Sequence, residues 1–148
     1  MKLTIYIEPT PKARPRVVRK GSRVMSYTPS RTAHAEAVIR TQIAESGVFF
    51  NRDTAVRLAA TFYRRRPKSA PKKVRLPITR PDCLNYSQLL QDALQGYLFA
   101  DDAQITTLVL RRVFGRLLRI EIEVTEDKRT PGYGEQEKGR KITEGKET

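Results

Sequence analysis

Four aspartates in the second half of the chain are the residues whose type and spacing could do chemistry. Asp82 precedes a run with helical periodicity, Asp92 lies within that run, and the pair Asp101-Asp102 follows it. Phosphodiester hydrolysis commonly uses carboxylates that hold a divalent metal ion, because the metal activates water and offsets charge as the leaving oxygen departs. Magnesium prefers oxygen ligands and keeps several waters, so that two or three carboxylates suffice. The aspartates therefore predict a Mg²⁺ site, with Mn²⁺ as an alternative ion.

Each aspartate also has an ordinary structural interpretation. Asp82 follows a proline and could cap the N-terminus of a helix, as any aspartate can. Asp101 and Asp102 could form a turn that leads into a strand. Taken one by one, the structural interpretations are favoured. Taken together in a strongly basic chain, the structural and the catalytic interpretations compete evenly.

The segment between the aspartates must be a helix that stops early if Asp82 and Asp102 are to meet. Ending near Gln95, with Gly96 as the stop, it would be about 16 Å long at ~1.5 Å per residue. Residues 95–102 could then return roughly 26 Å at ~3.3 Å per residue, so closure is easy. The polar face of this helix would stack Asn85, Gln88 and Asp92. Its apolar face has helical spacing and consists of Tyr86, Leu89, Leu90, Ala93, Leu94 and Tyr97.

The charge of the chain indicates an anionic partner. Lys and Arg number 29 and Asp and Glu 16, giving a formal net charge of +13. Residues 126–148 carry equal numbers of basic and acidic side chains, so the excess lies on residues 1–125. Such a domain repels itself unless an anion binds, and nucleic acid is the commonest one. Two alternative interpretations of the charge remain open: a basic protein that its charge keeps in solution, and an RNA-binding or structural protein. A role at a membrane surface is less favoured, because the sequence contains no basic amphipathic helix with a bulky apolar face.

Two cation-rich segments are the predicted contacts to DNA. The first is a loop fixed by Pro9, Pro11 and Pro15 that turns at Gly21, and the second is a mobile loop over residues 64–73. Solvated basic loops are the alternative, but the density of cations favours contact with a phosphate backbone. The candidate DNA-binding residues are Lys12, Arg14, Arg16, Arg19, Lys20, Arg64, Arg65, Arg66 and Arg80.

The periodic segments predict one α/β (α+β) domain, a mixed β-sheet with packed helices, over residues 1–125. Residues 126–148 are expected to be a disordered polar tail. The single cysteine, Cys83, excludes an intramolecular disulfide, and the polar start does not resemble a secretion signal, so we expect a cytoplasmic protein. The first expected elements are a strand at 2–8, a helix from Ser30 as N-cap to about Ser46 with Gly47 as the stop, and a strand at 54–64. The helix described above follows. Two strands at 104–113 and 116–125 are expected to pair with each other through a turn at Gly115.

Two blocks of sequence carry a resemblance to a known family. The first consists of Pro9–Arg16, Gly21 and Tyr27–Pro29, and the second of Arg80–Asn85, Asp92–Gly96 and Asp101–Ile105. These blocks resemble RusA-type Holliday junction resolvases, and the resemblance covers residues 1–125. It implies a RusA-like fold and a small homodimer, often prophage-encoded in bacteria, that nicks opposing strands of four-way DNA junctions in recombination and repair with Mg²⁺. Asp82 and Asp102 match the metal ligands of the family, with Asp101 beside them, while Asn85 and Asp92 match supporting motif positions.

The chain departs from the family pattern at two positions. That pattern is Pro-Asp-x-Asp-Asn with a lysine three residues after the asparagine, whereas this chain has Leu84 and Gln88 at those two places. Leucine cannot bind a metal, and glutamine cannot present a cation to the scissile phosphate. Losing both groups would typically cost several kcal/mol of transition-state stabilisation. The alternative function is therefore a dimer that binds branched DNA without cutting it.

Overall fold

The structure is a computed structural model that describes residues 1–128. The polar tail predicted from residue 126 lies outside the described residues except for its first three positions. No helix within the described part is long and apolar enough to cross a bilayer. The elements are β1 (Lys2–Ile5), β2 (Arg16–Lys20), β3 (Arg23–Tyr27), α1 (Ser30–Ala44), β4 (Val56–Arg64), α2 (Cys83–Leu94), the 3₁₀ turn η1 (Asp102–Gln104), β5 (Ile105–Phe114) and β6 (Arg119–Glu126).

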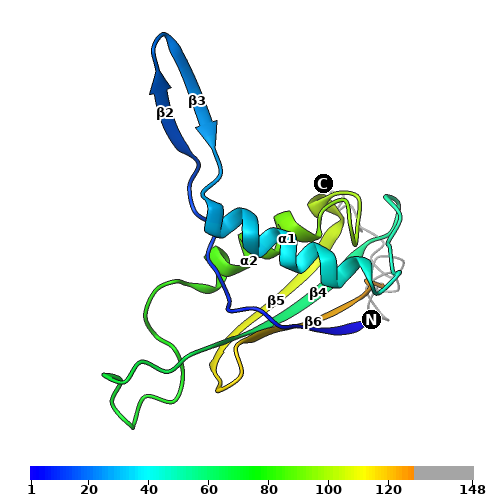
Figure 1. The fold of residues 1–148 in the computed structure, drawn as a ribbon. Helices are drawn as coiled ribbons and strands as arrows, with labels where there is room; N and C mark the ends of the chain where they lie inside the picture. Colours follow the sequence, from blue (N-terminus) through cyan, green and yellow to red (C-terminus); the bar gives the residue numbers. More distant parts are fainter. Residues whose placement is uncertain (129–148) are drawn as a thin grey trace, which may run out of the picture.

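Four strands form one mixed sheet in the order β1-β6-β4-β5, and both helices cover one of its faces (Figure 1). The strand β4 is antiparallel to β6 and parallel to β5. The parallel pair is possible because α2 returns the chain to the start of the sheet, as a crossover connection must. The predicted α+β domain with a mixed sheet and packed helices is confirmed.

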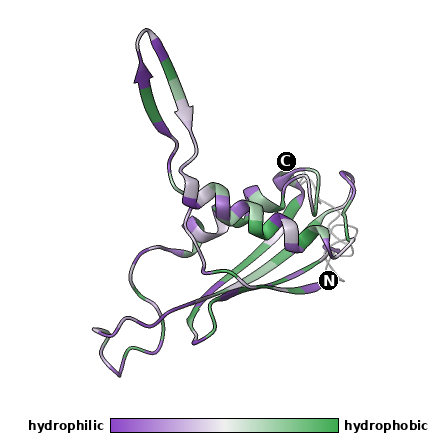
Figure 2. Ribbon diagram, in the orientation of Figure 1, coloured by the Kyte–Doolittle hydropathy of each residue, from purple (hydrophilic) through white to green (hydrophobic). Residues whose placement is uncertain are grey.

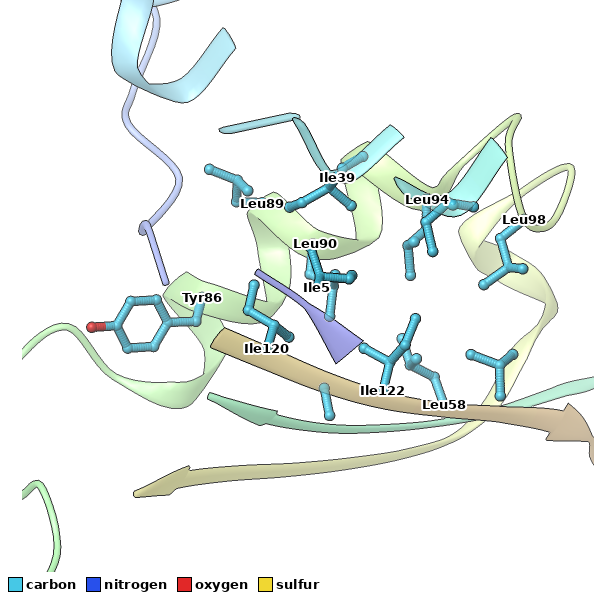
Figure 3. Packing of buried hydrophobic residues seen from close by; sticks show 14 of the residues in the cluster. Ile5, Ile39, Leu58, Tyr86, Leu89, Leu90, Leu94, Leu98, Ile120 and Ile122 are labelled. Carbon is cyan, nitrogen blue, oxygen red and sulfur yellow. The ribbon is translucent and has the colours of Figure 1, made fainter. Parts of the chain in front are cut away.

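The core lies between the sheet and the two helices. Alternate residues of β4 and β6 point into it, since side chains of a strand alternate between faces. One stripe of α2 meets them, and the ring of Tyr86 stacks on Phe62 with 5.3 Å between ring centroids. Each fully buried large apolar side chain contributes about 1.5–3 kcal/mol. Figure 3 shows this packing around Ile5, Ile39, Leu58, Leu90, Leu94, Ile120 and Ile122.

The predicted pairing of the last two strands is wrong, because β4 lies between β5 and β6. Two strand spacings of ~4.8 Å separate β5 from β6, and residues 115–118 can span ~13 Å. This link passes the end of β4, where the Gly115 amide donates to the Arg64 carbonyl at 3.0 Å. A Cβ at Gly115 would meet the Tyr63 side chain at 2.9 Å, so the close passage requires glycine.

The predicted cation-rich loop after the first strand is partly wrong, because residues 16–27 form a β-hairpin. Its strands β2 and β3 pair only with each other and turn at Gly21, whose φ of +64° confirms the predicted turn. The hairpin projects away from the sheet and helices (Figure 1). Hydrophilic and hydrophobic residues are mixed along both of its strands (Figure 2). Neither strand had enough length or apolar alternation to be predicted.

Two boundaries also differ from the prediction. The first strand ends at Ile5 rather than residue 8. The first helix begins at Ser30, but Pro29 occupies the N-cap position and no side chain caps it. The pyrrolidine ring fixes the φ of Pro29, here −54°. With its ψ at 141° this residue is extended, and the helix starts directly after it. Gly47 follows the helix end with a positive φ, as predicted.

Candidate active site

A cavity of about 540 Å³ opens on the polar face of α2. Leu84, Gln88 and Asp92 lie four residues apart and therefore share one face of the helix. Residues from two distant segments, Lys12 and Asp102, complete the wall. The full lining is Lys12, Leu84, Ser87, Gln88, Gln91, Asp92 and Asp102. The predicted stack of Gln88 and Asp92 is present, while Asn85 lies outside the lining.

The early end of α2 brings Asp102 back to this face. The helix ends at Leu94, and Gly96 follows with a φ of +82°. The Gly96 amide then donates to the Phe99 carbonyl at 2.7 Å, and the buried Leu98 and Phe99 anchor the return. The helix end that the sequence required is confirmed.

The two adjacent aspartates have different roles. The Asp101 carboxylate accepts a hydrogen bond from the Ala103 amide at 2.9 Å and caps η1, while Asp102 lines the cavity. The Ala103 amide, followed by a hydrogen bond with Asp102, lowers the pKa of Asp101. The same hydrogen bond with Asp101 raises the pKa of Asp102, with desolvation and the charges of Asp101 and Asp92 adding to it. Asp102 is therefore the member of the pair that lines the cavity, while Asp101 caps the turn beside it.

The Gln104 side chain fixes this turn through four hydrogen bonds. Its side-chain oxygen accepts hydrogen bonds from the amides of Ala100 and Asp101, both at 2.9 Å. Its side-chain nitrogen donates to the carbonyls of Asn51 and Thr54 at 2.7 and 3.0 Å. The buried amide thus ties the Asp101-Asp102 turn to the segment that precedes β4, and it holds Asp102 at the cavity.

Asp82 has a structural role at the start of α2. It is the N-cap of α2, and its Oδ1 accepts a hydrogen bond from the Asn85 amide at 2.8 Å. The carboxylate is exposed and is not among the side chains that line the cavity. The carbonyl of Asn85 in turn accepts from the Lys12 amide at 3.1 Å, which ties the N-terminal segment to the start of α2. The catalytic roles predicted for Asp82 and Asp102 stay predictions.

Sequence reasoning missed an ion cluster at the edge of the cavity. The Lys12 ammonium lies 2.8 Å from Glu36 Oε1 and 2.8 Å from Asp92 Oδ2. Arg40 adds a second cation 3.8 Å from the Glu36 carboxylate. Partial burial by itself lowers the pKa of Lys12, but hydrogen bonds and charges from Asp92 and Glu36 outweigh it, so that the pKa lies above its ordinary value. Lys12 therefore supplies a positive charge to the cavity lining, in which position 88 is a glutamine instead of the lysine of the family pattern.

Glu36 gave little signal in the sequence. It lies on α1, far along the chain from Asp92, and it resembles any glutamate on a polar helix face. The spacing of Glu36 and Arg40 predicts only an ordinary i,i+4 pair. Its side chain is only 12% exposed because Lys12 and α2 pack over it, a tertiary contact that no local pattern contains.

The donor groups present suit a magnesium ion only in part. Among residues 1–128, no three His, Cys, Asp or Glu side chains come close enough together to form a metal site on their own. Leu84 stands on the cavity wall with 69% of its surface exposed, where the family pattern has an aspartate. Asp92 and Asp102 are the two carboxylates among the residues that line the cavity. Because Mg²⁺ is often held by one or two carboxylates plus waters and substrate phosphates, these two carboxylates fit such a site when DNA supplies the rest.

The predicted DNA-binding cations fall into two groups. Arg14, Arg16, Arg19 and Lys20 are exposed, as are Arg65 and Arg80. Arg64 and Arg66 instead donate within the chain, as Lys12 does to Glu36. Arg64 reaches the carbonyls of Thr79 and Arg80 at 3.3 Å each, and Arg66 reaches that of Val74 at 2.6 Å.

Arg112 was missed by the sequence analysis, and it holds the same connection between β4 and α2. Its Nη1 donates to the carbonyls of Thr79 and Pro81 at 2.7 and 2.6 Å. The predicted basic loop over residues 64–73 contains neither helix nor strand beyond the end of β4 at Arg64, as expected. Arginine–carbonyl hydrogen bonds order its two ends.

Comparison with known proteins decides the family. The sequence model of the family described as Endodeoxyribonuclease RusA matches residues 7–125. The chain belongs to the RusA family. The match begins just after β1, ends within β6 and includes every residue that lines the cavity. A protein of Bacillus subtilis (strain 168) named "Uncharacterized protein YqaN" is 26% identical over 139 residues, which cover 85% of this chain and 96% of that protein. Nucleases of the RusA family are generally metal-dependent and bind branched DNA junctions.

Proposed function

We propose that this RusA-family chain binds four-way and other branched DNA and hydrolyses phosphodiester bonds there with Mg²⁺, Mn²⁺ being the alternative ion. The setting would be recombination and repair in the cytoplasm of a bacterium, with a phage or prophage gene as the source. One observation carries the proposal: the block that matches the family motif folds around a single cavity that gathers Asp92, Asp102 and Lys12.

The residues of the cavity have separable roles in this proposal. Asp102 and Asp92 would hold the metal, Asp82 at the start of α2 is a further candidate ligand, and Asp101 would keep Asp102 in place. When bound, the metal would activate water and offset charge on the leaving oxygen. Lys12 neutralises Asp92 in the free protein, and its ammonium can donate to a phosphate oxygen when DNA enters. Lys12, Asp92 and Asp102 already line the cavity.

A homodimer is part of the proposal. A four-way junction has two equivalent strands to cut, and two-fold symmetric proteins present two equivalent sites. One chain offers one cavity of this composition among its described residues. Two copies related by a two-fold axis would therefore match the symmetry of the junction.

The second candidate function is binding without cutting. The observation that favours it is the position of Leu84 and Gln88, which lie on the cavity wall itself rather than at a distance. A leucine beside Asp92 and Asp102 removes a charged ligand from the place where a metal would lie. The two functions share the partner and differ only in the chemistry.

A cleavage assay separates the two functions. The chain at molar excess is incubated with a labelled four-way junction in Mg²⁺ or Mn²⁺, beside a linear duplex of equal length, and Asp102→Asn serves as the matched control. Paired nicks in the junction that Asp102→Asn abolishes support the nuclease. Binding without any nick supports the non-cutting protein. Equal affinity for single-stranded RNA and junction DNA in competition would contradict both functions and favour an RNA-binding protein.

A further inference from the structure

The hairpin of residues 16–27, here called the ribbon, is unusual because no other part of residues 1–128 covers it. All residues of β2 and β3 are exposed, and the two strands form a sheet of their own. An isolated two-stranded hairpin is marginally stable in water. A partner that binds the ribbon would therefore stabilise it.

Apolar side chains lie exposed on both faces of the ribbon. Cross-strand partners share a face, so Val18 and Met25 lie together on one face and Val17 shares the other with Val24. A cluster of exposed apolar residues on one small element marks a binding surface. The exposed fractions are 67% for Val17, 45% for Val18, 67% for Val24, 57% for Met25 and 46% for Tyr27.

The charge of the ribbon identifies the kind of partner. Arg16, Arg19, Lys20 and Arg23 lie on it, and residues 9–35 contain no aspartate or glutamate. Two such ribbons from two copies of this chain would repel each other when packed face to face, because like charges on adjacent strands are destabilising. A polyanion with apolar surface between its charges satisfies both features, and DNA has sugars and base edges between its phosphates.

The base of the ribbon adjoins the candidate active site. A second cavity of about 540 Å³ lies there, and its charged side chains are Arg14, Arg16 and Arg31. The segment that leads into the ribbon is fixed at Lys12, whose side chain lines the active-site cavity. The next residue is fixed too, since the Ala13 amide donates to Thr32 Oγ1 at 3.4 Å. Cations thus continue from the site cavity through the arginine-lined cavity to the ribbon.

We propose that the ribbon enters the major groove of a duplex arm of the branched DNA whose backbone lies at the candidate active site. This inference rests on the proposed function, because it requires that the chain bind DNA. A two-stranded ribbon fits the major groove, which is about 12 Å wide. Five residues of strand at ~3.4 Å each give the ribbon a length of roughly 17 Å. Its cations contact phosphates at the groove edges, while Val18 and Met25, which share one face, contact base edges and thymine methyl groups.

The test uses the salt dependence of DNA binding. The ribbon variant carries Arg16→Gln, Arg19→Gln, Lys20→Gln and Arg23→Gln. A matched control removes the same charge from exposed positions elsewhere: Lys2→Gln, Arg52→Gln, Arg111→Gln and Lys128→Gln. Affinity for a labelled four-way junction is measured by fluorescence anisotropy from low to moderate NaCl. Since each released counterion contributes about 0.9 to the log–log slope on duplex DNA, the ribbon variant is expected to lose up to about 3.6 of that slope.

A second measurement locates the ribbon in the groove. Guanine N7 lies in the major groove, so the wild-type chain is expected to protect guanines of one arm from methylation by dimethyl sulfate. The ribbon variant and the double variant Val18→Ser/Met25→Ser are expected to lose that protection. Circular dichroism and thermal unfolding accompany both, and an unchanged melting temperature confirms that the core is intact.

Four results would overturn the inference. If the ribbon variant and the matched control lose equal slope, the ribbon acts only through net charge. If neutralising the ribbon changes the oligomeric state in sedimentation but leaves the slope intact, its partner is a second copy of the chain. If the wild type binds no junction at all, the proposed function fails together with this inference. If junction binding and cutting persist while the ribbon variant matches the wild type, the proposed function stands and the ribbon inference alone fails.

Discussion

At the scale of single residues, Leu84 decides how well the cavity can hold a metal. Leu84→Asp with Gln88→Lys would add a carboxylate and a cation to the wall that already holds Asp92 and Asp102. We expect the double variant to bind Mg²⁺ at least about tenfold more tightly than wild type, or ~1.4 kcal/mol, by calorimetric titration. Since Leu84 is exposed, the change should barely affect folding stability.

The matched control for this gain of binding is Leu84→Asn with Gln88→Lys, which gives a side chain of the same shape as aspartate without its charge. A carboxylate effect appears only in the aspartate variant, whereas a packing effect appears in both. A folded aspartate variant with unchanged magnesium affinity, both alone and with junction present, would show that position 84 does not face the metal.

Lys12 is the second residue whose replacement has a sharp outcome. Lys12→Met would leave Glu36, which is 12% exposed, without its nearest cation. Removing one partner of a partly buried pair costs about 1–3 kcal/mol, so we expect a loss of that size in urea unfolding. Adding Glu36→Gln to Lys12→Met should recover part of the loss, because the uncompensated charge disappears. A double variant no more stable than Lys12→Met would mean that Glu36 is not what Lys12 stabilises.

Single residues were the least predictable part of this chain. Asp82 had two interpretations in the sequence, and the structure confirms the helix cap without testing the chemistry. The choice of Asp102 over Asp101 depends on the hydrogen bond from the Ala103 amide, which requires the turn to exist first. Glu36 and Arg112 reach their partners only through tertiary contacts, and such contacts leave no mark on local sequence.

At the scale of elements, the start of α2 separates a structural from a catalytic role for Asp82. Asparagine caps helices about as well as aspartate, while alanine costs about 1 kcal/mol. We therefore expect Asp82→Asn to unfold at nearly the wild-type urea concentration and Asp82→Ala to unfold earlier. If Asp82 also serves the metal, both variants lose junction cutting. Retained cutting in Asp82→Asn would show that Asp82 acts as a helix cap only.

The strand pair β4–β6 carries an ion cluster whose contribution depends on pH. Glu121 accepts from Arg119 Nε at 2.9 Å and from the Tyr63 hydroxyl at 2.8 Å. The hydrogen bond from Arg119, followed by that from Tyr63, lowers the pKa of Glu121. A carboxylate with a lowered folded-state pKa stabilises the fold above its unfolded-state pKa, and this stabilisation is lost as the pH falls through the folded-state value.

Glu121→Gln should therefore destabilise the protein at pH 7 and have almost no effect near pH 3. Glu121 is substantially exposed, so the difference at pH 7 should be only about 0.5–1 kcal/mol, screened by salt. Urea unfolding of wild type and variant at the two pH values measures it. An equal difference at both pH values would mean that the contacts of Glu121 do not depend on its charge.

Most helices and strands of the sheet could be predicted from the sequence, but the pairing of the strands could not. The alternation in β4 and β6 and the stripe of α2 are local patterns, and both sets of residues are buried as expected. The alternation of a strand says which face is buried but not which strand lies beside it, so β5 and β6 were paired wrongly. The ribbon escaped prediction because its residues are exposed on both faces and show no periodicity of burial.

At the scale of the whole molecule, the net charge of +13 is a cost to the free protein. Self-repulsion destabilises a compact chain, and salt reduces it because the Debye length falls from ~30 Å at 0.01 M to ~10 Å at 0.1 M. We therefore expect the melting temperature to rise with NaCl over this range in the absence of DNA. A melting temperature that falls over the same range would mean that attractive ion pairs outweigh the repulsion.

Junction DNA should stabilise the same protein more than salt does, since it binds the folded state and brings its own charge. A ligand at 100 times its Kd raises the free energy of unfolding by about 2.7 kcal/mol. We expect the melting temperature at low salt to rise with junction concentration, and the rise to shrink as NaCl is added, because salt weakens phosphate contacts. Linear duplex at equal phosphate concentration is the control. If duplex and junction raise the melting temperature equally at every salt concentration, the chain reads the phosphate backbone but not the branch, and the proposed selectivity for junctions is wrong.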